Sequence, residues 1–518
     1  MLVGTIGSPR RALVEGSGRI TVGVGTPDEV VIGWWIGGED RWYIPEREIT
    51  VRQSLVQGAP VVMSAIRIPG GDATHTVFGA VQGPRELAVI EIANKARAPI
   101  VGVLTVSGPG ARNVSVDGST VRIDGFPLLT LARAPLRTAS AETLGELEAV
   151  VTGGDATDGP SGLGGPNARA FALMVPVSQA TTIRASVLIG ASSSIALSGT
   201  PVLGSLPDVH TAASGWGRHL DRGPRLTSPD HERSEHLRAL IGGALLAAEP
   251  AIADRTTSVR VRAVLARAFD AVGLHVEAGA LLENIDDHQG RRGVIDDAGA
   301  AGPAVDPLDG LLTTATVVDA LAHHAWVTSD VVFAETFAPA AAGAVEAIVK
   351  ACRKNDALHP LLACAGSLRA LFRTANDPRA AAQAKSVWER FGSPWPPPSV
   401  SLPPLPASSA GGSFVPDDAL RLGAAIRASA DDVARVGPDG AVDLFGAFAP
   451  SWRGSSFDVR NVAVPGGRLS AAVRWHGQRA AVLWEVDGPN DVTITCRSID
   501  PAWSASGRGG DALLAPSA

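Results

Sequence analysis

The stretch from residue 283 to residue 299, ENIDDHQGRRGVIDDAG, concentrates side chains that could do chemistry. Two carboxylates can act as proton donor and base on one substrate. Adjacent acids cannot reach a substrate from opposite sides, so Asp287 and Asp306 are the best candidates for a catalytic pair. The acidic side chains of this region are Glu283, Asp286, Asp287, Asp296, Asp297, Asp306 and Asp309.

Two other interpretations of this stretch compete with catalysis. Carboxylate, amide and guanidinium groups hydrogen-bond to sugar hydroxyls, which makes Asp286, Gln289 and Arg291 candidate substrate-binding residues. The same composition is typical of a solvated loop with local ion pairs, followed by a helix N-cap at Asp309. Of the three interpretations, we favour the solvated loop, followed by sugar binding and then by catalysis.

A group of aromatic residues lies in the segment 33–46, GWWIGGEDRWYIPE, which includes the only tyrosine of the chain. Aromatic faces can stack on sugar rings, so Trp42 is a candidate substrate platform. Trp34 and Trp35 are neighbours on a predicted strand and point to opposite faces. We therefore expect at most one of these two in the core, and packing is the simpler alternative for the whole group.

No metal and no cofactor is expected. Asp319 and His323 are four residues apart on a predicted helix, a spacing that could hold a metal, but no third ligand is evident. The glycine-rich segment 159–170 follows no βαβ unit, so a phosphate site is not predicted there. The three cysteines form no CxxC pair, which argues against a thiolate zinc site and a disulfide framework.

The overall composition excludes several classes of partner. The net charge is −7 at pH 7 and no basic tract stands out, so nucleic-acid binding is not expected. The first twenty residues lack the charged-then-apolar pattern of a secretory signal, and no apolar run looks long enough to span a bilayer. We expect a cytoplasmic protein without a membrane partner.

Residues 1–215 are predicted to form a large antiparallel β-sandwich. Short β-branched runs such as residues 29–37 and 99–106 follow one another without a helical period. Asp117 and Gly118 lie between two alternating segments and predict a hairpin turn. Many short strands of this kind favour a sandwich over an α/β sheet.

Residues 216–392 are predicted to form a domain of helical hairpins. Ser228 is the expected N-cap of the first helix and Pro229 its first helical residue, before apolar residues that recur at helical spacing. Short loops between helices favour antiparallel hairpins. Eight helices are predicted along the chain, the first from residue 228 and the others at about 258–273, 275–284, 310–326, 330–352, 358–375, 378–391 and 417–435.

The remaining residues divide into a linker and a second β region. Residues 393–416 are too rich in proline for a helix or a strand, and predict an extended linker. Residues 417–518 hold the last helix and a small β segment. Its predicted strands are at 468–476, 479–486 and 491–496.

Three stretches resemble the bacterial six-hairpin glycosidases, glucoamylase-like proteins in which an N-terminal β-sandwich precedes an (α/α)6 barrel. Residues 214–246 are similar to the passage from the sandwich into the first barrel helix. Residues 288–330 are similar to a loop and helix of that barrel, and residues 474–507 to its C-terminal strands. The resemblance implies a β-supersandwich followed by a helical-hairpin barrel, here incomplete because too few helices are predicted to close a ring.

The resemblance leaves three hypotheses for function. The first is a saccharide-binding or regulatory pseudoenzyme, because residues 354–381 pass almost directly between helices where the family brings a catalytic acid loop. The second is an active inverting glycoside hydrolase on an α-glucan-like substrate, whose two carboxylates would lie roughly 6.5–9.5 Å apart. The third is a structural or assembly protein, in which a second copy or another protein covers the apolar flank of the incomplete array.

Overall fold

A computed structural model describes residues 1–24, 26–159, 167–191, 200–253, 257–290, 292–295, 307–355, 358, 361–362, 364–391, 416–437, 440–446 and 448–515. These residues fall into two compact units, one up to Arg218 and one from His219 onward. The predicted linker lies outside the described residues except for Pro416, where a helix begins. Each unit is described by itself.

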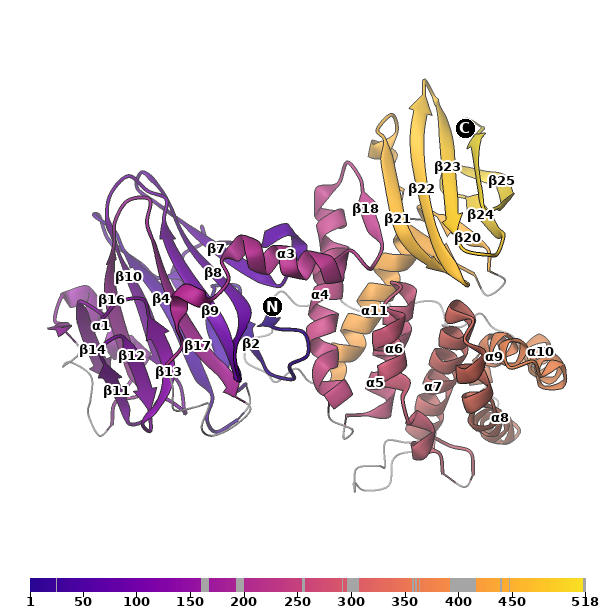
Figure 1. Ribbon diagram of the computed structural model, residues 1–518, viewed down its shortest axis with the longest axis horizontal. Helices are drawn as coiled ribbons and strands as arrows, with labels where there is room; N and C mark the ends of the chain where they lie inside the picture. The colour runs from indigo at the N-terminus through magenta and orange to yellow at the C-terminus, as the bar shows by residue number, and fades with distance from the viewer. Residues whose placement is uncertain are drawn as a thin grey trace. The chain divides into compact units, whose positions relative to one another are not determined.

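The N-terminal unit consists of two antiparallel sheets (Figure 1). Asp117 and Thr120 pair across Gly118, whose φ of 58° confirms the predicted hairpin. The first sheet has the order β1 (Leu2–Gly4), β2 (Arg11–Val14), β3 (Ile20–Val22), β4 (Val30–Gly37), β10 (Ile100–Ser107), β16 (Ala170–Val177), β14 (Arg137–Ala141) and β15 (Thr157–Asp158), with β5 (Trp42–Tyr43) beside β4. The second has the order β11 (Val114–Asp117), β12 (Thr120–Ile123), β13 (Phe126–Leu131), β17 (Thr182–Ala191), β9 (Arg85–Asn94), β8 (Gly71–Gln82), β7 (Val61–Ile68) and β6 (Arg52–Leu55).

The inner faces of the two sheets form one apolar core. Trp34 of β4 and Leu104 of β10 contribute from the first sheet, and Val77 of β8 and Ile90 of β9 from the second. Side chains on a strand alternate between faces, so every second residue of these strands is available to the core. The predicted sandwich is confirmed.

The outer face of the first sheet is also covered. Helix α1 (Leu144–Gly153) packs Leu147 and Val151 onto a cluster that includes Trp35, which is 2% exposed. Thr143 caps this helix by accepting from the backbone N–H of Glu146. The expectation that at most one of the tryptophans at 34 and 35 is buried is therefore wrong, because α1 gives the sheet a second apolar layer.

Gly79 of β8 marks a point where two backbones approach closely. A Cβ atom added to Gly79 would lie 2.1 Å from the carbonyl oxygen of Gly4 in β1. We expect Gly79→Ala to lower the free energy of unfolding by about 1–3 kcal/mol, the usual range for overpacking. Chemical denaturation checks this value, and hydrogen exchange should show faster exchange in β1 and β8.

Gly145 offers a matched control in the same unit. A Cβ at Gly145, in the first turn of α1, would have no neighbour within 4 Å. We expect Gly145→Ala to be neutral or slightly stabilising, because alanine favours helix more than glycine does. Equal stabilities for the two variants would contradict the close approach at Gly79.

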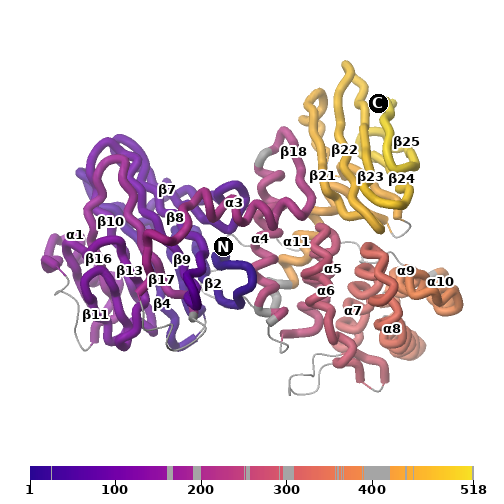
Figure 2. Tube along the Cα trace, viewed as in Figure 1, coloured from indigo at the N-terminus to yellow at the C-terminus, as the bar shows by residue number. Residues whose placement is uncertain are grey.

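The second unit contains the predicted helices. α5 packs against α6, α7 and α11, while α7 packs against α8 and α9. The row runs from α4 and α11 at one end to α9 and α10 at the other, as Figures 1 and 2 show. The helices are α4 (His231–Ala253), α5 (Val259–Ala271), α6 (His275–Leu282), α7 (Pro307–Thr328), α8 (Val331–Cys352), α9 (Cys364–Thr374), α10 (Pro378–Phe391) and α11 (Pro416–Val433). All eight predicted helices are present, and the described ones form an open array of hairpins.

Helix α8 is long and apolar enough, by length and composition alone, to cross a membrane. This corrects the expectation that no apolar segment reaches that length. The helix packs against α7 and α9, and it buries Phe337, Ala344 and Ile348. One such helix is weak evidence for a membrane span, because core helices of globular proteins have the same composition.

The C-terminal residues form two further sheets beside the helices (Figure 1). Three strands were predicted and are present, but the sheets contain more, including β18, which precedes α4 in the chain and pairs with β21. One sheet has the order β18 (Arg225–Thr227), β21 (Phe457–Val464), β22 (Gly467–His476), β23 (Arg479–Asp487) and β26 (Gly509–Leu513). The other has the order β19 (Ala434–Val436), β20 (Val442–Leu444), β24 (Val492–Cys496) and β25 (Asp500–Gly507). Together with the sandwich and the helices, these strands confirm the predicted fold class.

Candidate functional site

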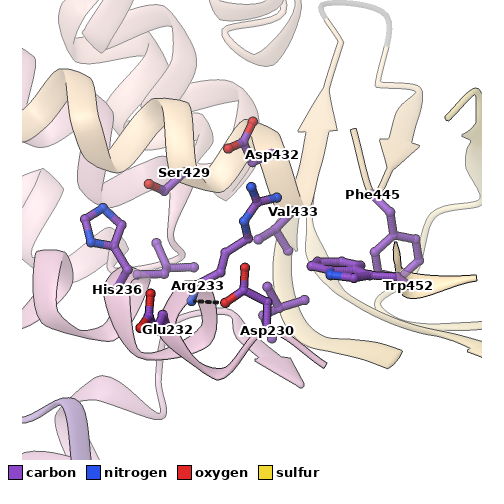
Figure 3. Close-up of a pocket in the computed structure, with 11 residues that line it drawn as sticks. Asp230, Glu232, Arg233, His236, Ser429, Asp432, Val433, Phe445 and Trp452 are labelled. Atoms are coloured by element: carbon purple, nitrogen blue, oxygen red, sulfur yellow. Dashed lines mark hydrogen bonds between the residues drawn. The ribbon is translucent and has the colours of Figure 1, made fainter. Parts of the chain in front are cut away.

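A pocket of about 410 Å³ lies where three segments of the second unit meet. The segments are the chain from β18 into the start of α4, the end of α11, and the chain from β20 to the short 3-10 helix Pro450–Trp452. Its volume is within the usual range for small-molecule sites, about 300–1,000 Å³. The lining residues are Leu226, Asp230, Glu232, Arg233, His236, Leu237, Ser429, Asp432, Val433, Phe445 and Trp452, most of which Figure 3 labels.

Asp230 organises the α4 side of the pocket. Its Oδ1 atom accepts a hydrogen bond from the backbone N–H of Arg233 at 3.1 Å, which is the geometry of an N-cap. The predicted N-cap at Ser228 is wrong: the Ser228 hydroxyl donates to the carbonyl of Asp230 at 2.8 Å instead, and α4 begins at His231. The cap places Glu232, Arg233 and His236 in the first turns of α4.

Aromatic residues form the apolar floor. The ring of Phe445 meets Phe457 edge to face, with centroids 4.8 Å apart, and the Trp452 ring lies 5.4 Å from Phe457. Phe445 and Trp452 are both buried. Phe445 has a φ of 57°, a left-handed conformation that is unfavourable for a side chain of this size. Its N–H donates to the carbonyl of Val433 at 2.8 Å, which ties the floor to the end of α11.

Charged and polar groups form the rim. The guanidinium of Arg233 lies 5.6 Å from the centre of the Trp452 ring, and Figure 3 shows it rising between Asp432 and Trp452. Glu232 and His236 lie at the other end of the pocket and are exposed. Partial burial raises the pKa of Asp432; Arg233 opposes this effect and the neighbouring Asp431 adds to it. An apolar floor with a few convergent polar groups is the usual composition of a ligand pocket.

A second polar cluster is buried among the helices. Asp270 of α5 is fully buried, and its Oδ1 atom lies 2.8 Å from Nδ1 of His275 and 3.0 Å from Nδ1 of His324. Arg267, one turn earlier on α5, lies 3.5 Å from Asp319, and burial lowers the pKa of this arginine to about 10. These contacts join α5, α6 and α7.

Asp319 and His323, the two possible metal ligands, interact with other groups of the protein. Asp319 accepts a hydrogen bond from the hydroxyl of Ser367 at 2.7 Å and pairs with Arg267. Burial lowers the pKa of His323 well below its usual value, with the neighbouring Arg267 acting in the same direction. Within the described part of the chain, no group of three or more ligands could hold a metal ion.

The described members of the site predicted in the acidic loop lie outside the pocket. Asp286 and Asp287 belong to the 3-10 helix Ile285–His288, between α6 and α7. Gln289 donates to the carbonyls of Gly293 at 3.0 Å and of Ala340 at 2.8 Å, so its amide ties the loop to α8. Arg291, Asp296, Asp297 and Asp306 lie outside the described residues.

Two further expectations concern Asp309 and Trp42. Asp309 is not an N-cap, because α7 begins at Pro307; its carboxylate pairs with Arg260 at 3.0 Å. Trp42 belongs to the N-terminal unit and is half-buried, with its ring against Gly37 and the outer apolar cluster. The structure therefore gives Trp42 a packing role in its sheet.

The sequence did not predict that the pocket residues form a site. They come from three segments that are far apart along the chain, and only the fold brings them together. The sequence SPDHER at 228–233 carried a readable signal, since acids at a helix start are expected as caps. That signal predicts the cap at Asp230 but not the aromatic floor opposite it.

No protein-family model and no curated protein sequence matches the chain. Among the solved structures that match is a bacterial glucoamylase complexed with acarbose, the same kind of protein that the sequence resembles. It is 10% identical to this chain, with a TM-score of 0.47, and the match covers 75% of this chain. The chain spans 65% of the length of that glucoamylase. At this identity the likeness concerns the fold and says nothing of side-chain chemistry.

Proposed function

We propose that the protein binds a saccharide in the pocket between α4, α11 and the C-terminal strands. The observation that carries this proposal is the pairing of a buried aromatic floor with a rim of carboxylates, a hydroxyl, an imidazole and a guanidinium. A sugar ring has the matching surfaces, because its C–H face is apolar and its hydroxyls both donate and accept. Asp230 retains acceptor capacity for hydroxyls, since a carboxylate accepts at two oxygens.

Hydrolysis of a glycosidic bond is the second candidate function. It is favoured by the raised pKa of Asp432, which helps this carboxyl to keep a proton for a leaving oxygen. Asp230, which caps α4, or Glu232 in its first turn would then supply the base from another side of the pocket. Release of reducing ends from α- and β-glucan oligosaccharides tests this role, and Asp432→Asn should abolish any release.

A thermal-shift panel of α- and β-glucan oligosaccharides tests the binding proposal on the full chain. A saccharide at a hundred times its dissociation constant should add about 2.7 kcal/mol of stability. Glu232→Ala with His236→Ala should reduce this gain, while both exposed substitutions should change the unliganded stability by less than about 0.5 kcal/mol each. Asp491→Ala, an exposed change outside the pocket, is the control.

Two outcomes distinguish binding in the pocket from binding in the loop that the sequence predicts. Loss of the thermal shift in the double variant at residues 232 and 236 supports the pocket. If Asp287→Asn lost the thermal shift and the double variant kept it, the binding site would be the loop of Asp286, Asp287 and Gln289. Absence of a shift with every saccharide would overturn the proposal.

Self-association of the chain stays a prediction. The open helical array exposes apolar side chains, among them Val332 at 74% and Val276 at 77%. Light scattering on the full chain checks whether two copies associate.

A further inference from the structure

The charges that line the pocket are unequal. The carboxylates of Asp230, Glu232 and Asp432 are accompanied by the single guanidinium of Arg233. Helix ends do not remove this excess, because α4 presents its N-terminus and α11 its C-terminus to the pocket. The partial charges of these two ends have opposite signs and offset each other. Three carboxylates against one guanidinium leave the pocket with net negative charge.

Contacts between the described residues do not neutralise all of the carboxylates in the pocket. Asp230 uses Oδ1 for the backbone N–H of Arg233, and among the described residues no hydrogen bond engages its other oxygen. Asp432 lies next to Asp431 in the chain, and these two carboxylates repel each other, while Arg233 and Arg435 attract the charge of Asp432. A cation in the pocket would relieve that repulsion, whereas an anion would add to it.

Resting on the proposed saccharide site, we infer that the pocket selects an amino sugar, a saccharide whose ring carries a primary ammonium group. The ring lies beside Phe445 and Trp452, and the ammonium group reaches the carboxylate of Asp432. An ion pair in such a half-solvated place is much stronger than in bulk water and weaker than in a dry interior. A uronic acid of the same size is repelled by the same groups.

Isothermal titration calorimetry of the full chain at pH 7 and low salt tests this selection with D-glucosamine, D-glucose and D-glucuronate. We expect glucosamine to bind at least about tenfold more tightly than glucose, which corresponds to about 1.4 kcal/mol. Glucuronate should bind more weakly than glucose. Cyclohexylamine, a ring amine without hydroxyls, should bind more weakly than glucosamine; equal binding would overturn the inference, because the site would then recognise charge alone.

Asp432→Asn removes one negative charge while keeping the shape of the side chain. We expect the preference for glucosamine over glucose to fall several-fold in this variant. Asp491→Asn makes the same charge change at an exposed position outside the pocket, and should leave the preference intact. Equal affinities for glucose and glucosamine would overturn the inference but leave the saccharide site standing. Failure of all saccharides to bind would overturn both the selection of an amino sugar and the saccharide site itself.

Discussion

Replacing Asp270 with alanine should lower the free energy of unfolding by about 3–5 kcal/mol, the range for removing one member of a buried, hydrogen-bonded charged group. Asp270 is fully buried, and the Nδ1 atoms of two histidines lie within hydrogen-bonding distance of its carboxylate. Without it, His275 and His324 lose their shared acceptor in a site where water is largely excluded. His324 is itself 5% exposed, so it cannot turn to solvent for a replacement.

Chemical denaturation followed by helical ellipticity measures this loss. Asp270→Asn should lose less, about 1–3 kcal/mol, because the amide keeps one acceptor oxygen in nearly the same shape. Asp491→Ala, which removes an exposed carboxylate, should stay within about 0.5 kcal/mol of the natural chain. If Asp270→Ala behaved like Asp491→Ala, the cluster would not hold α5, α6 and α7 together.

Local patterns in the sequence predicted the elements well. The helix expected at 258–273 is observed as α5, Val259–Ala271, and the helix expected at 378–391 coincides with α10. Asp377, next to Pro378, accepts from the backbone N–H of Ala380 at 2.9 Å, which is the cap that this dipeptide predicts. Such features depend on residues within one or two turns of each other, and a single sequence contains all of that information.

Features that depend on distant segments could not be predicted in the same way. The strand β18 is three residues long, and its pairing with β21 follows from the fold rather than from its own sequence. The same holds for the pocket, whose floor at Phe445 and Trp452 faces a rim on α4. The catalytic interpretation of the acidic loop rested on residue types alone, and residue types do not say which carboxylates meet.

The burial of Trp35 is an intermediate case. Its cover, α1, begins with Thr143 and Glu146, which form a capping box whose spacing is visible in the sequence. A single helix among many strands does not, however, indicate which face of which sheet it covers. Alternation along β4 correctly predicted that Trp34 and Trp35 point to opposite faces, and only the position of α1 makes both of those faces apolar.

Trp35→Ala should therefore lower the free energy of unfolding by about 3–5 kcal/mol, the range for truncating a buried tryptophan. The cavity would lie in the outer cluster that Leu147 and Val151 of α1 cover, so hydrogen exchange at 144–153 should rise more than exchange in β8. Unchanged exchange in α1 would mean that other contacts hold this helix to the sheet.

Trp42→Ala is the comparison that separates packing from ligand binding in this unit. Trp42 is half-buried at the edge of the same cluster, so its loss should cost less than the loss of Trp35. If Trp42 were a sugar platform, Trp42→Ala would remove the saccharide-induced thermal shift. We expect that shift to persist, because every residue that lines the pocket belongs to the other unit of the chain.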